Sequence, residues 1–81
     1  MNEQAMRIKG FEDLDETKIC YFKVEDNWML YLPGCGLGGL RNHQVVEHED
    51  GTISATPSIL IKSHSQATRH GYLTKGIWTE V

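Results

Sequence analysis

Short apolar stretches separated by polar turns dominate this chain. Residues 18–24 and 28–32 are rich in aromatic and β-branched residues, and the polar residues 25–27 separate them. Short stretches of this composition, bounded by turn residues, are typical of paired β-strands. These two stretches therefore predict a first hairpin with a short polar loop.

Two further hairpins are predicted in the second half. Residues 43–48 and 52–56 flank Glu49-Asp50-Gly51, and residues 70–74 and 77–81 flank Lys75-Gly76. A glycine at such a position supplies the positive φ that tight hairpin turns require. Pro57 precedes the apolar stretch 58–62, and because proline cannot donate a ladder hydrogen bond, we expect it on a sheet edge or at a bulge.

The chain contains no long helical period. Residues 6–9 alternate briefly, and residues 11–17 could form one helical turn, since Phe11 and Leu14 are three positions apart. The predicted strands recur every eight to twelve residues, a spacing typical of small all-β folds. The sequence predicts a mainly β fold, a small antiparallel β-sandwich or open barrel built from hairpins.

Residues 32–39, Leu-Pro-Gly-Cys-Gly-Leu-Gly-Gly, hold four of the eight glycines. Such a stretch could turn a corner, hold a metal or hold a phosphate. Gly34, Gly36 and Gly39 match G-x-G-x-x-G, but that motif binds phosphate only where it opens a helix. Residues 40–46 carry no cap and no helical period, so the sequence argues against a nucleotide-binding loop here.

Composition predicts one globular domain of 81 residues, with 40% hydrophobic and 23% charged residues. The net charge of −3 gives no basis for direct binding to nucleic acid. No apolar run approaches 18 residues and the first residues do not form a signal peptide, so we expect a cytoplasmic protein that does not bind membranes. For the two cysteines, a thiol or metal ligand is favoured over a disulfide.

Acidic residues are concentrated in the first part of the chain. Seven of the eleven precede Tyr31, and Glu12, Asp13, Asp15 and Glu16 form one acidic stretch. This stretch is either plain solvated surface or a binding surface that imitates nucleic-acid phosphates or docks onto a basic protein. We predict that it binds a partner.

Two aromatic residues of the first hairpin are the predicted anchors. Trp28 and Tyr31 follow the acids in the first hairpin, although most aromatic residues of a chain this small belong to the core. We predict that they bind the partner together with the acidic stretch, because buried aromatics contribute most of the affinity of an interface.

The second half resembles a family of small phage and prophage proteins of unknown function that are often labelled ammonia monooxygenase. The resemblance covers residues 32–78 and rests on an ordered set of short motifs. These are Pro33-Gly34-Cys35-Gly36, then His43, Gly51-Thr52, residues 56–60, His70-Gly71-Tyr72 and Gly76-Ile77-Trp78. The resemblance implies a β-rich zinc-binding module with Cys35, His43 and His70 as metal ligands.

The chain departs from this pattern where the family has two further cysteines, because Leu32 and Arg69 stand there. Structural zinc is nearly always four-coordinate. Three matched ligands leave such a site one short, unless Cys20, His48 or His64 completes it. Loss of the metal is the favoured interpretation, and a rebuilt structural zinc site or an open catalytic site are the alternatives.

An enzymatic function is disfavoured. Cys35 with His43 or His70 could form a thiol–imidazole pair, but no orienting Asn or Asp is identifiable. We therefore expect a non-enzymatic phage or prophage accessory protein that binds a host or phage protein complex. The specific action that we expect is inhibition of a host-defence complex, anti-CRISPR activity included. The alternative is a structural zinc-binding β module, and the metal content of the native protein distinguishes the two.

Overall fold

The computed structural model describes residues 2–62 and 68–81, and their secondary structure is almost entirely β. The elements are β1 (Asn2–Gln4), β2 (Met6–Arg7), η1 (Phe11–Asp13, a 3-10 turn), β3 (Cys20–Val24), β4 (Asn27–Leu32), β5 (Gly36–Gly39), β6 (Gln44–Glu47), β7 (Ile53–Lys62), β8 (Thr68–Thr74) and β9 (Ile77–Glu80). In this part of the chain no helix has the length and apolar character needed to cross a membrane.

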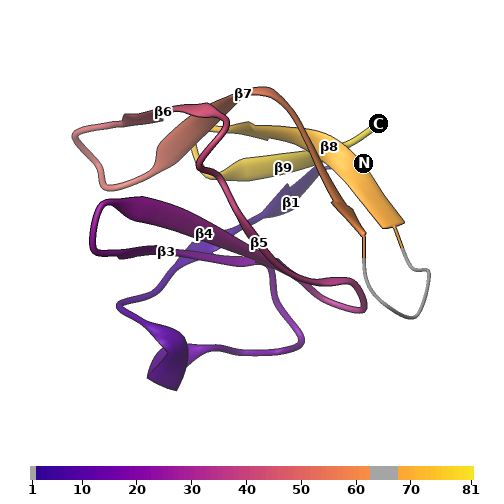
Figure 1. Ribbon diagram of the computed structural model, residues 1–81, viewed down its shortest axis with the longest axis horizontal. Helices are drawn as coiled ribbons and strands as arrows, with labels where there is room; N and C mark the ends of the chain where they lie inside the picture. The colour runs from indigo at the N-terminus through magenta and orange to yellow at the C-terminus, as the bar shows by residue number, and fades with distance from the viewer. Residues whose placement is uncertain (1, 63–67) are drawn as a thin grey trace.

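The strands form two sheets that face each other (Figure 1). The larger sheet has the order β1-β9-β8-β7-β6 and is antiparallel throughout. The smaller sheet has the order β2-β3-β4-β5. The predicted mainly β fold built from hairpins is confirmed, as an open two-sheet arrangement with η1 as its one short helical turn.

The chain crosses between the sheets at two buried residues. Ala5 lies between β1 and β2, and its N–H donates to the Gly76 carbonyl of the larger sheet (2.8 Å). Leu40 lies between β5 and β6, and its N–H donates to the Trp28 carbonyl (2.9 Å). At each crossing a buried backbone N–H is therefore hydrogen-bonded, and it would cost free energy if it were left without an acceptor.

The core lies between the two sheets and is formed by the strand side chains that point inward. In β4 the buried residues alternate with half-exposed ones, as expected for a strand with one face inward. The larger sheet contributes from β7, β8 and β9. One cluster joins both sheets, with Tyr21, Trp28, Leu30, Leu32, Ile53, Ile59, Ile61, Leu73 and Trp78 among its members.

The predicted hairpin turns have the backbone that their sequences indicate. Lys75 and Gly76 both have positive φ (49° and 75°), the pattern of a type I′ turn between β8 and β9. Between β6 and β7, an Asp50 carboxylate oxygen accepts hydrogen bonds from the Thr52 N–H (3.0 Å) and hydroxyl (2.6 Å). Gly51 in this turn has φ 88°.

The structure corrects the expectation of two separate strands on either side of Pro57. β7 runs continuously through this residue, and its register against β8 shifts between Ala55 and Ile59. A bulge leaves residues out of the ladder, so the missing N–H of Pro57 is tolerated in a central strand. Of the two expected places for Pro57, the sheet edge is therefore wrong, and the register shift agrees with the alternative of a bulge.

Three further features were not predicted. β1 and β5 are strands, although the first is short and polar and the second is mostly glycine. The pair β2–β3 is parallel, with Met6 opposite Cys20, whereas the sequence predicted only antiparallel pairs. Parallel neighbours need a long connection, and residues 8–19 supply it.

The glycine-rich stretch is a turn between β4 and β5. The Cys35 N–H donates to the Leu32 carbonyl (3.0 Å), and Gly34 has φ 77° directly after Pro33. Proline followed by a glycine of positive φ is the pattern of a type II turn. Gly36 enters β5 with φ 132°.

Replacing Gly34 or Gly36 with alanine is expected to lower the free energy of unfolding by about 1 kcal/mol per site. An added Cβ meets no atom within 4 Å at either position, so the loss comes from backbone strain alone. Urea unfolding measures it. Unchanged unfolding midpoints for both variants would show that the glycines are not required by backbone geometry.

Arg7 ties the two sheets together at one end. Its Nη1 donates to Glu47 Oε2 (2.9 Å) and to the Gly51 carbonyl (2.8 Å), and both acceptors belong to the β6–β7 hairpin. Its guanidinium carbon also lies 5.1 Å from the centre of the Trp28 ring. An edge strand of the smaller sheet is thus fastened to the larger one.

Candidate partner-binding face

The side of the smaller sheet that points away from the main core is apolar, and we call it the outer face. Strand register places its side chains in rows, because directly opposed residues point to the same side of a sheet. Met6, Cys20, Tyr31 and Leu37 form one row across all four strands, and Phe22 and Met29 are opposed in the next.

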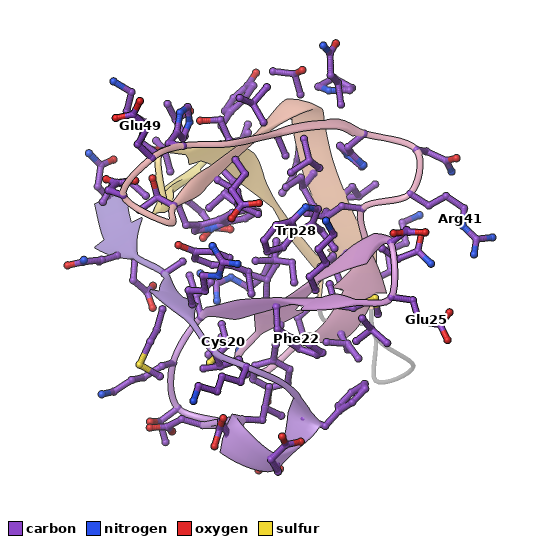
Figure 2. The ribbon with its side chains drawn as sticks, turned by 90° about the vertical axis from the view of Figure 1, so that its left-hand side faces the viewer. Cys20, Phe22, Glu25, Trp28, Arg41 and Glu49 are labelled. Atoms are coloured by element: carbon purple, nitrogen blue, oxygen red, sulfur yellow. The ribbon has the colours of Figure 1, made fainter. Side chains whose placement is uncertain are left out.

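The segment that contains η1 covers part of the outer face. The Phe11 ring packs edge-on against Phe22, with centroids 4.9 Å apart and planes at 69°. The Cys20 thiol points to the carbonyl oxygens of Lys18 (3.5 Å) and Asp15 (3.7 Å). Figure 2 shows Cys20 and Phe22 on the η1 side of β3, and both are fully buried. Cys20, a possible fourth metal ligand, is thus a small buried residue of the sheet.

The rest of the outer face is open. Exposed fractions reach 38% for Val24 and Leu37 and 36% for Met6, and Tyr31 is half-exposed. On the covering segment, Phe11 is itself 56% exposed. Scattered apolar residues on a surface are ordinary, whereas a contiguous patch typically marks an interaction site. Tyr31 and Leu37 are adjacent in this sense, because they are directly opposed on β4 and β5.

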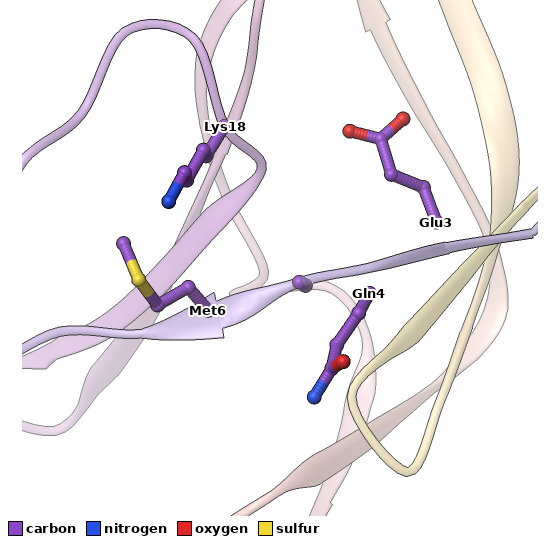
Figure 3. A pocket seen from close by; sticks show the side chains of 5 residues that line it. Glu3, Gln4, Met6 and Lys18 are labelled. Carbon is purple, nitrogen blue, oxygen red and sulfur yellow. The ribbon is translucent and has the colours of Figure 1, made fainter.

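The outer face ends in a hollow beside Met6, where the chain passes from β1 to β2. The hollow has a volume of about 400 Å³ and is lined by Glu3, Gln4, Ala5, Met6 and Lys18. Figure 3 shows the Met6 and Lys18 side chains together, with the Glu3 carboxylate farther along the strand. A partner side chain could enter the surface here.

The predicted acidic stretch lies on the segment that covers the outer face. Glu12, Asp13 and Glu16 are exposed. The Asp15 carboxylate is different, because one of its oxygens accepts from the Thr17 hydroxyl (2.6 Å) and N–H (2.9 Å). These bonds hold the pKa of Asp15 below its usual value. Three of the four acids thus face solvent, and the fourth fixes the local turn.

The two predicted aromatic anchors lie on opposite faces of β4. Tyr31 is on the outer face, in the row of Leu37. Trp28 points into the core, as Figure 2 shows, and is 8% exposed beside Tyr21, with ring centroids 6.3 Å apart. The odd sequence separation between them places them on opposite sides of one strand. The structure thus places Tyr31, and not Trp28, on the face that the segment with the acidic stretch partly covers.

The structure brings two of the predicted metal ligands to one serine. His43 Nε2 lies 3.1 Å from the Ser58 carbonyl oxygen, and His70 Nε2 lies 2.8 Å from the Ser58 hydroxyl. A carbonyl oxygen only accepts, so Nε2 of His43 carries the hydrogen. His48, a possible fourth ligand, instead contacts the Ser54 hydroxyl (2.8 Å).

The third predicted ligand lies elsewhere. The Cys35 thiol is buried and donates to the Ile61 carbonyl (2.9 Å). Within residues 2–62 and 68–81, no three His, Cys, Asp or Glu side chains lie close enough together to hold a metal ion. His64, the remaining possible ligand, lies outside the described residues.

Leu32 and Arg69, which stand where the resembling family has cysteines, have other partners here. Leu32 is fully buried in the core. Arg69 donates to Glu80 Oε1 (2.7 Å), which raises the pKa of Arg69 and lowers that of Glu80. A lowered carboxyl pKa stabilises the fold above the unfolded pKa, and this contribution is lost as the pH falls through the folded pKa.

Comparison of the chain with protein-family models, with curated proteins and with solved structures found no match. The resemblance to phage proteins therefore stays a prediction.

Several residues of the outer face were missed by sequence reasoning. Val24 could have been predicted, because it alternates with Cys20 and Phe22 along β3 and so points to the same side of the sheet. Unlike those two residues, it is exposed. Leu37 lies between glycines and gives no strand signal of its own. Only its place opposite Tyr31 reveals that it belongs to the outer face.

Proposed function

We propose that this protein is a small phage or prophage accessory protein that acts without catalysis, by binding a protein partner through the outer face. The observation that carries the proposal is the apolar outer face of a two-sheet core, with exposed carboxylates on the segment across it. Buried apolar anchors contribute most of the affinity of an interface, and rim charges select the partner. The partner that fits has an apolar patch surrounded by Lys and Arg.

The resemblance over residues 32–78 supports a phage origin, and phage accessory proteins act by occupying a surface of a host or phage complex. We propose inhibition of a host-defence complex, anti-CRISPR activity included, as the specific action. A basic surface that normally contacts nucleic acid is the kind of target that exposed carboxylates such as Glu12, Asp13 and Glu16 would fit.

The binding surface is tested with two leucine variants in a capture experiment from a host lysate. Leu37→Lys places a charge in the outer face, whereas Leu60→Lys places one on the exposed side of the larger sheet, where Leu60 is 51% exposed. A specific partner should be lost with Leu37→Lys and retained with Leu60→Lys. Equal retention by both variants would show that the outer face does not bind.

Reversing the exposed acids should slow association with a partner so identified. The triple variant Glu12→Lys, Asp13→Lys and Glu16→Lys keeps Asp15, because that carboxylate holds Thr17. The association rate should fall by roughly tenfold or more, and added salt should slow the parent protein in the same way. Surface plasmon resonance measures both rates.

The single variant Glu49→Lys is the control for net charge, since Glu49 is exposed on the β6–β7 hairpin. Per reversed charge, this variant should slow association much less than the triple variant does. If the triple variant associates at the parent rate, the acidic stretch is plain solvated surface.

A further inference from the structure

Cations gather at the end of the sandwich beside Trp28. A hollow of about 400 Å³ there is lined by Arg7, Ile8, Lys9 and Lys23. Three of these four residues are cations, in a chain whose net charge is −3. Like charges around one concavity repel each other, and a bound anion removes that repulsion.

Two of the three cations are not neutralised by direct pairing. Within residues 2–62 and 68–81, neither Lys9 nor Lys23 forms an ion pair. Arg7 pairs with Glu47, but both of its hydrogen bonds to the hairpin use Nη1. A guanidinium has five N–H donors, so those on Nε and Nη2 take no part in these two bonds. The hollow therefore carries excess positive charge and N–H groups that can donate to a ligand.

The Trp28 ring holds two of these cations in place. It lies 5.1 Å from the guanidinium carbon of Arg7 and 5.7 Å from the Lys23 ammonium. Attraction to an aromatic ring orients a cation without neutralising it. The positive groups are thus positioned before any ligand arrives, which lowers the entropic cost of binding.

A second hollow adjoins the first, because Lys23 lines both. Its volume is about 270 Å³, and its wall is mostly polar. Carboxylate, amide and guanidinium groups supply both donors and acceptors there. Its other lining residues are Asp26, Asn27, Trp28, Leu40, Arg41, His43 and Val45.

We propose that this end of the sandwich binds a phosphate-bearing small molecule. Arg7, Lys9 and Lys23 hold the phosphate, and the uncharged part of the ligand occupies the second hollow. A phosphate group presents acceptor oxygens in several directions, which suits three cations on separate side chains better than a planar carboxylate does. A nucleotide and the 5′-phosphate of a nucleic-acid strand offer the same chemistry.

Binding is tested by NMR, with amide shifts of the whole protein followed during titration. Pyrophosphate and adenosine monophosphate should give saturable shifts in β2 and the β3–β4 hairpin, with dissociation constants below roughly 1 mM. Adenosine should give none. Equal binding of adenosine and adenosine monophosphate, or no saturation by pyrophosphate up to about 10 mM, would overturn the proposal.

A pair of charge-matched variants tests the assignment of residues. Lys9→Gln with Lys23→Gln should weaken pyrophosphate binding by about tenfold or more. Lys62→Gln with Lys75→Gln removes the same charge outside both hollows and should change binding less than about twofold. Arg7 is left unchanged, because it fastens the β6–β7 hairpin. Equal weakening by both pairs would mean that net charge alone attracts the anion, and the site would be rejected.

The last comparison distinguishes the two sources of phosphate. A short oligothymidylate is titrated with and without a 5′-phosphate. Stronger binding of the phosphorylated strand than of adenosine monophosphate identifies a strand end as the ligand, and the reverse identifies a nucleotide. Both results support the phosphate site, whereas binding of the strand that ignores its 5′-phosphate contradicts it.

Discussion

Gly71→Ala is expected to destabilise the fold by about 3 kcal/mol or more. A Cβ at this position would overlap the Thr79 carbonyl oxygen and approach the Trp78 ring at 2.7 and 2.8 Å. Neither neighbour can shift cheaply. Thr79 is paired with Tyr72 in the β8–β9 ladder, and Trp78 is 1% exposed in the core.

Urea unfolding of the variant measures this loss, with Gly39→Ala as the matched control. Gly39 also lies in a strand, but an added Cβ there meets only the Met29 sulfur, at 3.8 Å. That variant should stay within about 1 kcal/mol of the parent protein, since alanine costs little where space and φ allow it. If Gly71→Ala also stays within that range, the close approach of β8 to β9 is not what requires glycine.

The second large effect is expected at Gly38, where β5 approaches β7. A Cβ would lie 2.8 Å from Ile61 Cδ1 and 3.0 Å from its Cγ1. Both atoms belong to a buried side chain. Gly38→Ala should therefore cost about 1–3 kcal/mol, the usual range for added volume in a packed core.

A double-mutant cycle tests whether this cost comes from Ile61. Ile61→Val removes Cδ1 and alone should cost about 0.5–1.5 kcal/mol. The combined variant should be more stable than the sum of the single losses predicts, because valine makes room for the new methyl group. Strict additivity would show that the two side chains do not compete for the same space.

The hairpins could be predicted because their signals are local. Lys75-Gly76 and Asp50-Gly51 identify their turns by residue type, and the flanking stretches alternate with a period of two. Such signals need no knowledge of what lies across the sheet. The buried side of β4 does not follow from such signals, because residues 28–32 are apolar throughout.

The strands that were not predicted, β1 and β5, form because of the strands beside them. Every residue of β1 is exposed, so no apolar alternation marks it, and it pairs because β9 presents an edge. Glycines disfavour strands intrinsically, yet β5 pairs with β4, and the glycine at position 38 leaves room for Ile61 of β7. These are tertiary causes that one sequence does not display.

The candidate site, too, could be predicted from the sequence only in part. The acidic stretch was visible in the sequence, but the choice between Trp28 and Tyr31 required knowing which side of β4 faces the core. The meeting of His43 and His70 at Ser58 joins residues from the start of β6, from β7 and from β8. Sequence spacing does not give the register between separate strands, so it could not predict this contact.

The pairing of β1 with β9 has a consequence for the order of folding. Asn2 and Thr79, which share a hydrogen bond of 3.1 Å, are 77 positions apart. Hairpins close within microseconds, whereas contacts this distant form late because the chain entropy lost on closing them is larger. Until β1 returns, β9 keeps an open edge of unpaired backbone groups. The partly folded chain is therefore the species most exposed to edge-to-edge aggregation.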